Sequence, residues 1–138
     1  MERGGESQQA LLGQQLEHDR RMKTIDRLHD LIAQGAKGLG VLNAGAVVAM
    51  LAFVQALVGE PTYPAFKPYA LSALSFFLLG AFLATIVFFF HHTYINHTFQ
   101  DSGRQKLWHK VIWRLLIASA VSAFVGGVLV TAGICVAV

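Results

Sequence analysis

The sequence is short of charged residues, and the shortage is concentrated in three stretches. Only 14% of its 138 residues are Asp, Glu, Lys or Arg, whereas an ordinary soluble domain carries about 25%. None of these residues occurs between Lys37 and Glu60, between Lys67 and Asp101, or after Arg114, which leaves gaps of 22, 33 and 24 residues. About 20 apolar residues of helix cross a hydrocarbon core. The sequence therefore predicts an all-α membrane protein with three transmembrane helices, and excludes a soluble domain or a disordered chain.

Cysteine and titratable residues are scarce where chemistry would need them. The single cysteine, Cys135, excludes a disulfide framework and has no histidine beside it at that end of the third stretch. The buried acids and bases of proton-coupled transporters are missing from all three stretches. No nucleophile–base pair, phosphate-binding loop or cofactor motif is present either. We therefore expect no enzyme, and no catalytic, cofactor or metal site.

Proline is confined to one short connection. All three prolines (Pro61, Pro64, Pro68) stand between the first two apolar stretches, where they favour an extended, turned loop.

The predicted organisation of the chain has seven segments. They are a disordered N-terminus (1–8), an amphipathic cytoplasmic helix (9–37), transmembrane helices at 38–59, 70–90 and 111–138, an outer loop at 60–69, and a basic cytoplasmic connection at 91–110.

The distribution of Lys and Arg predicts the orientation. The N-terminal segment has six of them, the first connection has one, and the second connection has four. Cytoplasmic segments carry the excess of Lys and Arg, so we expect a multi-pass membrane protein with a cytoplasmic N-terminus and the C-terminus outside. Residues at the second connection are expected to contact anionic lipid headgroups, with no role in nucleic-acid binding: Arg104, Lys106, Lys110, Arg114, Trp108 and Trp113.

The N-terminal segment has the composition of a helix that assembles with something else. A row with alternating spacings of four and three residues is typical of a coiled-coil seam, diluted here by polar members: Leu11, Gln15, His18, Met22, Ile25, His29, Ile32 and Ala36. The apolar part of this cytoplasmic interaction face is expected at Met22, Ile25, Leu28 and Ile32. The helix is too charged to insert, and it either lies on the membrane surface or packs against copies of itself or a partner.

Small residues at intervals of four predict close helix packing in lipid, where hydrophobicity gives no drive to pair. The predicted helix-packing residues lie just before and within the first span and within the third span: Ala36, Gly40, Ala44, Gly45, Ser119, Ala123, Gly126 and Gly127. Asn43 and Gln55 are the strongly polar residues of the first span. Each is expected to bond between helices, or to line a pore if several copies surround one.

Six histidines raise the question of a metal site or a pH switch. His91, His92 and His97 cluster after the second span. His97 lies six residues after His91 and five after His92, whereas two histidines that bind one metal from the same helix usually lie four residues apart. Interfacial polar residues at a helix end are the favoured interpretation. His18 and His29 fall on the seam, where protonation would make facing copies repel, although a weak, hydrated seam also tolerates them.

The run VLNAGAVVAMLAF, preceded by a charged helix, resembles a group of short bacterial inner-membrane proteins in which an LN-small-Gly-Ala run opens the first of about three spans. The resemblance covers residues 20–55 and implies the layout and a place in a bacterial inner membrane, without an activity or site residues. Taken with the helix faces, it leads us to expect a small integral membrane scaffold or accessory subunit, in a homo-oligomer or with a membrane or cytoplasmic protein partner. The alternative is an oligomeric pore or membrane-permeabilising effector.

Overall fold

The part of the chain that the structure describes folds into three long helices. The computed structural model describes residues 3–99 and 105–137, with side chains described for 11–91 and 107–137. The helices are α1 (Arg3–Leu57), α2 (Tyr63–Phe99) and α3 (Gln105–Ala137), and the described residues contain no strand. All three are long and apolar enough to cross a membrane. The prediction of an all-α chain with three membrane-length helices is therefore confirmed.

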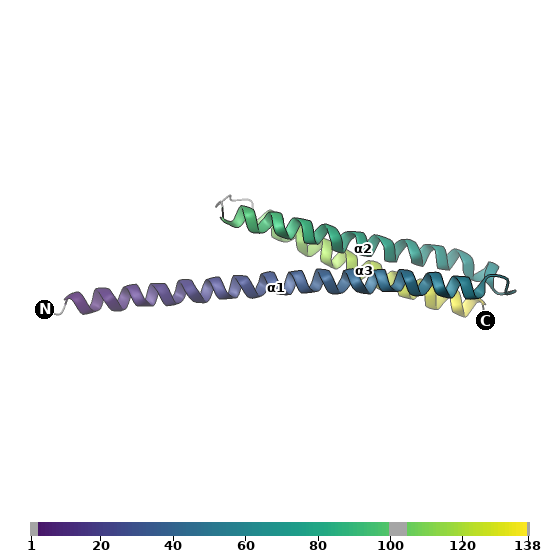
Figure 1. The fold of residues 1–138 in the computed structure, drawn as a ribbon, viewed down its shortest axis with the longest axis horizontal. Coiled ribbons are helices and arrows are strands. Elements are labelled where there is room, and N and C mark those ends of the chain that lie inside the picture. The colour runs from purple at the N-terminus through teal and green to yellow at the C-terminus, as the bar shows by residue number, and fades with distance from the viewer. Residues whose placement is uncertain (1–2, 100–104, 138) are drawn as a thin grey trace. The chain divides into compact units, whose positions relative to one another are not determined.

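The chain forms two units, Met1–Ile32 and Ala33–Val138. The second unit is a bundle, in which the α1 segment 33–57, α2 and α3 pack together. Figure 1 shows α2 reversing direction after α1, and α3 running antiparallel to α2. At one end of the bundle Met50, Phe66 and Ala70 form a buried cluster, with Val130 and Ala137 of α3 packed against it.

A tight turn at residues 58–62 joins α1 to α2. Gly59 has φ +98°, a left-handed conformation that side chains disfavour and that commonly ends a helix. The turn is closed by backbone bonds from Glu60 N–H to Leu57 O (3.0 Å) and from Tyr63 N–H to Glu60 O (3.1 Å). The next helix starts with the bond from Phe66 N–H to Thr62 O (3.2 Å).

The helix bounds differ from the predicted boundaries at both connections and near the N-terminus. Helix α2 begins at Tyr63, inside the predicted loop 60–69. Pro64 lies in its first turn, where the backbone nitrogens have no intrahelical partner, so proline costs no hydrogen bond there. Helix α1 begins at Arg3, inside the segment 1–8 predicted to be disordered, and helix also covers much of the predicted connection 91–110. No proline interrupts either region.

The bundle is held by a seven-residue repeat rather than by a repeat of four. The buried positions of α2 alternate spacings of four and three, which is the spacing that left-handed helix pairs use: Phe66, Ala70, Ala73, Phe77, Gly80, Ala84, Val87 and His91. The facing row of α3 has the same alternation with buried or half-buried members: Ile112, Leu116, Ser119, Ala123, Gly126, Val130, Gly133 and Ala137. Both rows mix large and very small residues, so a large side chain on one helix fits against a small residue on the other.

Candidate functional site

A polar cluster lies where the three helices of the bundle meet. Asn43 of α1 and Ser119 of α3 are both fully buried. The amide Nδ2 of Asn43 donates to its own helix at Leu39 O (2.9 Å) and lies 3.4 Å from Ser119 Oγ. Ser119 Oγ in turn donates to the backbone oxygen of Gly80 in α2 (2.8 Å). One chain of hydrogen bonds thus links α1 to α3 and α3 to α2.

A second hydroxyl reinforces the contact between α3 and α2. Ser122 Oγ donates to Phe76 O at 2.6 Å. Ser119 and Ser122 are three residues apart on α3, and their acceptors Phe76 and Gly80 are four apart on α2, which places both bonds on the same helix faces. A serine hydroxyl within a helix usually bonds back to the backbone of its own helix, as that of exposed Ser75 does with Leu71 O (2.9 Å). Ser119 and Ser122 instead connect two helices.

The absence of a side chain at Gly80 makes the cluster possible. A Cβ atom on Gly80 would lie 2.6 Å from Asn43 Cγ and 2.8 Å from Asn43 Nδ2, too close for any real contact. The glycine Cα hydrogen takes that place and points at the Asn43 amide, a close contact common where helices pack tightly. Asn43 Oδ1 is buried without a hydrogen-bond partner among the described residues. This unsatisfied oxygen raises the cost of burying the amide, which the rest of the cluster must offset.

Two further glycines of α3 accept aromatic rings from α2. A Cβ on Gly126 would lie 2.6 Å from the ring of Phe77, and one on Gly133 would lie 2.9 Å from the ring of Phe66. Phe66 also stacks edge-on against Phe53 of α1, with ring centroids 5.3 Å apart. These contacts fix the register of α2 against α3 through shape alone.

The structure divides the predicted helix-packing residues into two groups. Ala36, Ser119 and Gly126 are buried, Ala123 is half-buried, and Gly40 is half-buried with its missing Cβ directed at Ala84. Ala44, Gly45 and Gly127 are exposed, and a Cβ on Gly45 or Gly127 would meet nothing within 4 Å. Only some of the small residues spaced four apart therefore lie at contacts between helices.

The two predicted polar residues of the first span are in different surroundings. Asn43 belongs to the buried cluster, whereas Gln55 is exposed near the end of α1. Among the predicted interaction residues Met22, Ile25 and Leu28 are exposed, and Ile32 is buried.

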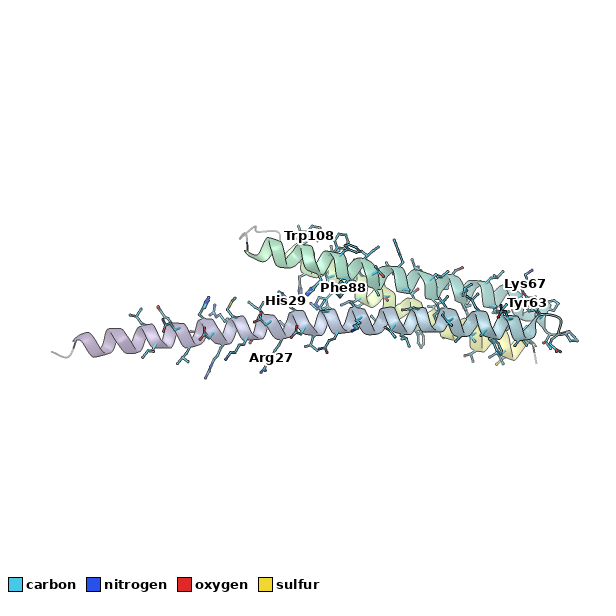
Figure 2. The ribbon with its side chains drawn as sticks, in the orientation of Figure 1. Arg27, His29, Tyr63, Lys67, Phe88 and Trp108 are labelled. Atoms are coloured by element: carbon cyan, nitrogen blue, oxygen red, sulfur yellow. The ribbon has the colours of Figure 1, made fainter. Side chains whose placement is uncertain are left out.

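The predicted headgroup residues belong to α3 and the segment before it. Lys110, Trp113 and Arg114 are exposed and Trp108 is half-buried, with its ring 5.3 Å from that of Phe90. Arg104 lies outside the described residues, as does the side chain of Lys106. Figure 2 shows Trp108 near one end of the α2–α3 pair and Tyr63 with Lys67 near the other. Aromatic and cationic residues thus lie toward both ends of the apolar bundle.

Sequence reasoning missed Gly80, Phe66 and Phe77 as members of the site. The sequence signal for them is the spacing of residues along α2: bulky and very small residues occur in one row whose members are alternately four and three residues apart. No known protein family, curated protein or solved structure matches this chain. Its chemistry is therefore argued from the residues themselves. The amide and hydroxyl groups of the cluster bond from one helix to another, and these bonds fasten the bundle.

Proposed function

We propose that this protein is a membrane-anchored scaffold, in which the three-span bundle serves as a rigid anchor and the N-terminal helix makes the functional contact. In this proposal the protein is not an enzyme, it resides in a bacterial inner membrane, and the N-terminal helix is amphipathic and cytoplasmic. The observation that supports it best is a contrast between the two units. In the bundle, Asn43, Ser119 and Ser122 are buried and make hydrogen bonds between helices. On the N-terminal helix, apolar Met22 and Ile25 are exposed.

The uncovered residues stand on a helix that cannot hide them in the bilayer core. Met22, Ile25 and Leu28 are exposed, and Arg21 and Asp26 stand between or beside them. Charged residues at that density prevent insertion. Covering the apolar side chains with a protein surface removes them from water, which is the dominant favourable term in protein association. A scaffold that recruits through this face has a direct physical reason to do so.

An oligomeric pore is the alternative function, and the bundle constrains it. Asn43 is fully buried within one chain and engaged with Ser119, so it lines a lumen only if the bundle opens. Exposed Gln55 and the open face at Gly127 remain as lining residues. If the scaffold function is right, vesicles of phosphatidylethanolamine and phosphatidylglycerol with many copies inserted retain an entrapped dye as long as empty vesicles do. Dye release that changes with Gln55→Leu would favour the pore.

The scaffold function is tested by removing the apolar face while leaving the anchor intact. We expect Met22→Asp with Ile25→Asp to reduce the mass of the particle extracted from membranes with its surrounding lipid, as measured by native mass spectrometry. Leu31→Asp is the matched control, since Leu31 is also exposed on this helix but lies off the row. Ile32 is left unchanged because it is buried. An unchanged mass for the double variant, with normal insertion, would contradict the proposal.

A further inference from the structure

The N-terminal helix has the pattern of a two-stranded coiled coil along the row from Leu11 to His29. When the row is written as a heptad, positions a are Gln15, Met22 and His29, and positions d are Leu11, His18 and Ile25. The central apolar layers are uncovered, with Met22 41% and Ile25 38% exposed. Figure 2 shows Arg27, an f position, projecting from the opposite side of the helix to His29. The apolar row and the charged back of the helix are therefore distinct faces.

The charges beside this row indicate which molecule covers it. Arg21 is at position g and Asp26 is at position e. In a parallel pair each g residue faces the e residue five positions later on the other strand, so Arg21 of each copy meets Asp26 of the other. An antiparallel pair would instead bring g toward g and e toward e, placing like charges together. We propose, building on the scaffold function, that the occupant is a second copy of this chain and that the two N-terminal helices pair in parallel.

Membrane insertion imposes the same direction. Two copies that insert with the same topology place their N-terminal segments on the same side of the bilayer and start them from the same surface. Confinement to that surface also raises the effective concentration of one helix near the other. This matters because Gln15, His18 and His29 would form polar layers, which lower the stability of a coiled coil. The pairing is accordingly expected in the full membrane-inserted chain.

The alternative is that the apolar row of the N-terminal helix lies on the bilayer surface, and the charge pattern disfavours this. Helices that lie on anionic membranes concentrate Lys and Arg on their polar face. Here Asp19, Asp26 and Asp30 alternate with the bases, and the segment 1–37 has as many acids as bases. Attraction to anionic headgroups is therefore largely cancelled, whereas attraction between oppositely charged e and g positions is kept.

A charge exchange tests the pairing. The full chain, labelled at Cys135 with donor or acceptor dye, is inserted into vesicles of phosphatidylcholine and phosphatidylglycerol, and association is measured by energy transfer against protein density. Arg21→Asp or Asp26→Arg makes both interhelical pairs repulsive and should weaken association about fivefold to tenfold. The double variant Arg21→Asp with Asp26→Arg restores opposite charges and should recover association to within about twofold.

Two controls separate this pair from effects within one helix. Glu17→Gln removes the intrachain ion pair between Glu17 and Arg21 (3.1 Å) and leaves position g untouched, so association should not change. His18→Leu replaces a polar d layer with an apolar one and should strengthen association. A double variant as weak as either single change, or a loss with Glu17→Gln equal to that with Arg21→Asp, would overturn the proposal.

Disulfide trapping tests the parallel direction independently. In a Cys135→Ser background, Ile25→Cys should form a disulfide between copies, because equivalent d positions face each other and a disulfide needs Cα atoms within about 7 Å. Leu31→Cys, at position c, should not. If position 25 forms no disulfide and a fluorophore there is quenched by lipid-attached quenchers, the face lies on the bilayer and the pairing is wrong. If it forms none and the particle mass still falls with Met22→Asp and Ile25→Asp, the pairing fails while the scaffold function stands with a different partner.

Discussion

At the scale of single residues, Gly80 sets how closely α2 approaches α1. Its missing side chain makes room for the Asn43 amide, and its backbone oxygen accepts the hydrogen bond of Ser119. One residue thus supplies both the space and the acceptor that the polar cluster needs. In lipid, where apolar residues gain little from pairing with each other, such contacts contribute a large share of the association between helices.

We expect Gly80→Ala to destabilise the bundle by about 1–3 kcal/mol, the usual cost of forcing an extra methyl into a packed interior. Unfolding in mixed micelles, followed by circular dichroism as denaturing detergent is added, measures the change. Gly127→Ala is the matched control, because a Cβ there meets open space and alanine favours helix over glycine. Adding Asn43→Ala should recover part of the loss, since it removes the atoms that clash. Full additivity of the two substitutions would mean that Gly80 and Asn43 do not interact.

At the scale of helices, two adjacent glycines of α3 have opposite surroundings. Gly126 is buried against the ring of Phe77, whereas Gly127 is exposed and a Cβ atom added there would have nothing within 4 Å. The difference follows from helix geometry: neighbouring residues are about 100° apart around the axis, so one faces α2 while the next turns away. Substitution of each in turn separates packing within the chain from packing between chains.

Gly126→Val should weaken the pairing of α2 with α3, whereas Gly127→Val should leave the stability of a single chain close to that of the parent. Protection of α3 backbone amides from hydrogen exchange in detergent reports on the pairing, and is expected to fall only for Gly126→Val. The two variants have the same composition and hydrophobicity, so they differ only in the direction of the added side chain. Equal loss of protection in both would contradict the placement of α2 against this face.

The spans were predictable from the sequence, and the buried faces were predictable only in part. A charge in lipid is so costly that gaps between charged residues mark the spans directly. Which face is buried leaves a weaker trace, because lipid-facing residues are as apolar as packed ones. A spacing of four joins Ser119 and Ala123 to exposed Gly127, while the observed row continues to Gly126. The choice between these two rows depends on Phe77 of a different helix, so α3 alone does not specify it.

At the scale of the whole molecule, we expect three spans to put the turn 58–62 and the N-terminal segment on opposite sides of the membrane. The Lys and Arg residues follow this division. The turn and its flanks have Lys67, while the segment between the second and third spans has four, including Lys110 and Arg114. Retention of cationic segments in the cytoplasm makes one orientation strongly preferred. If every copy takes the orientation that these charges predict, the parallel pairing proposed for the N-terminal helices depends on the same charges as the topology.

We expect a membrane-impermeant maleimide to label Thr62→Cys in intact bacterial cells, and to label Glu17→Cys only after the cells are permeabilised, both in a Cys135→Ser background. Thr62 and Glu17 are exposed in the structure, so access depends on the membrane alone. The opposite labelling pattern would mean that the predicted orientation is wrong, but the N-terminal helices of all copies would still lie on one side of the membrane, and parallel pairing would still be possible. Labelling of both positions in intact cells would mean that copies insert in two directions. Two populations would then place N-terminal helices on both faces of the membrane, and pairing between Arg21 and Asp26 would be restricted to copies of equal orientation.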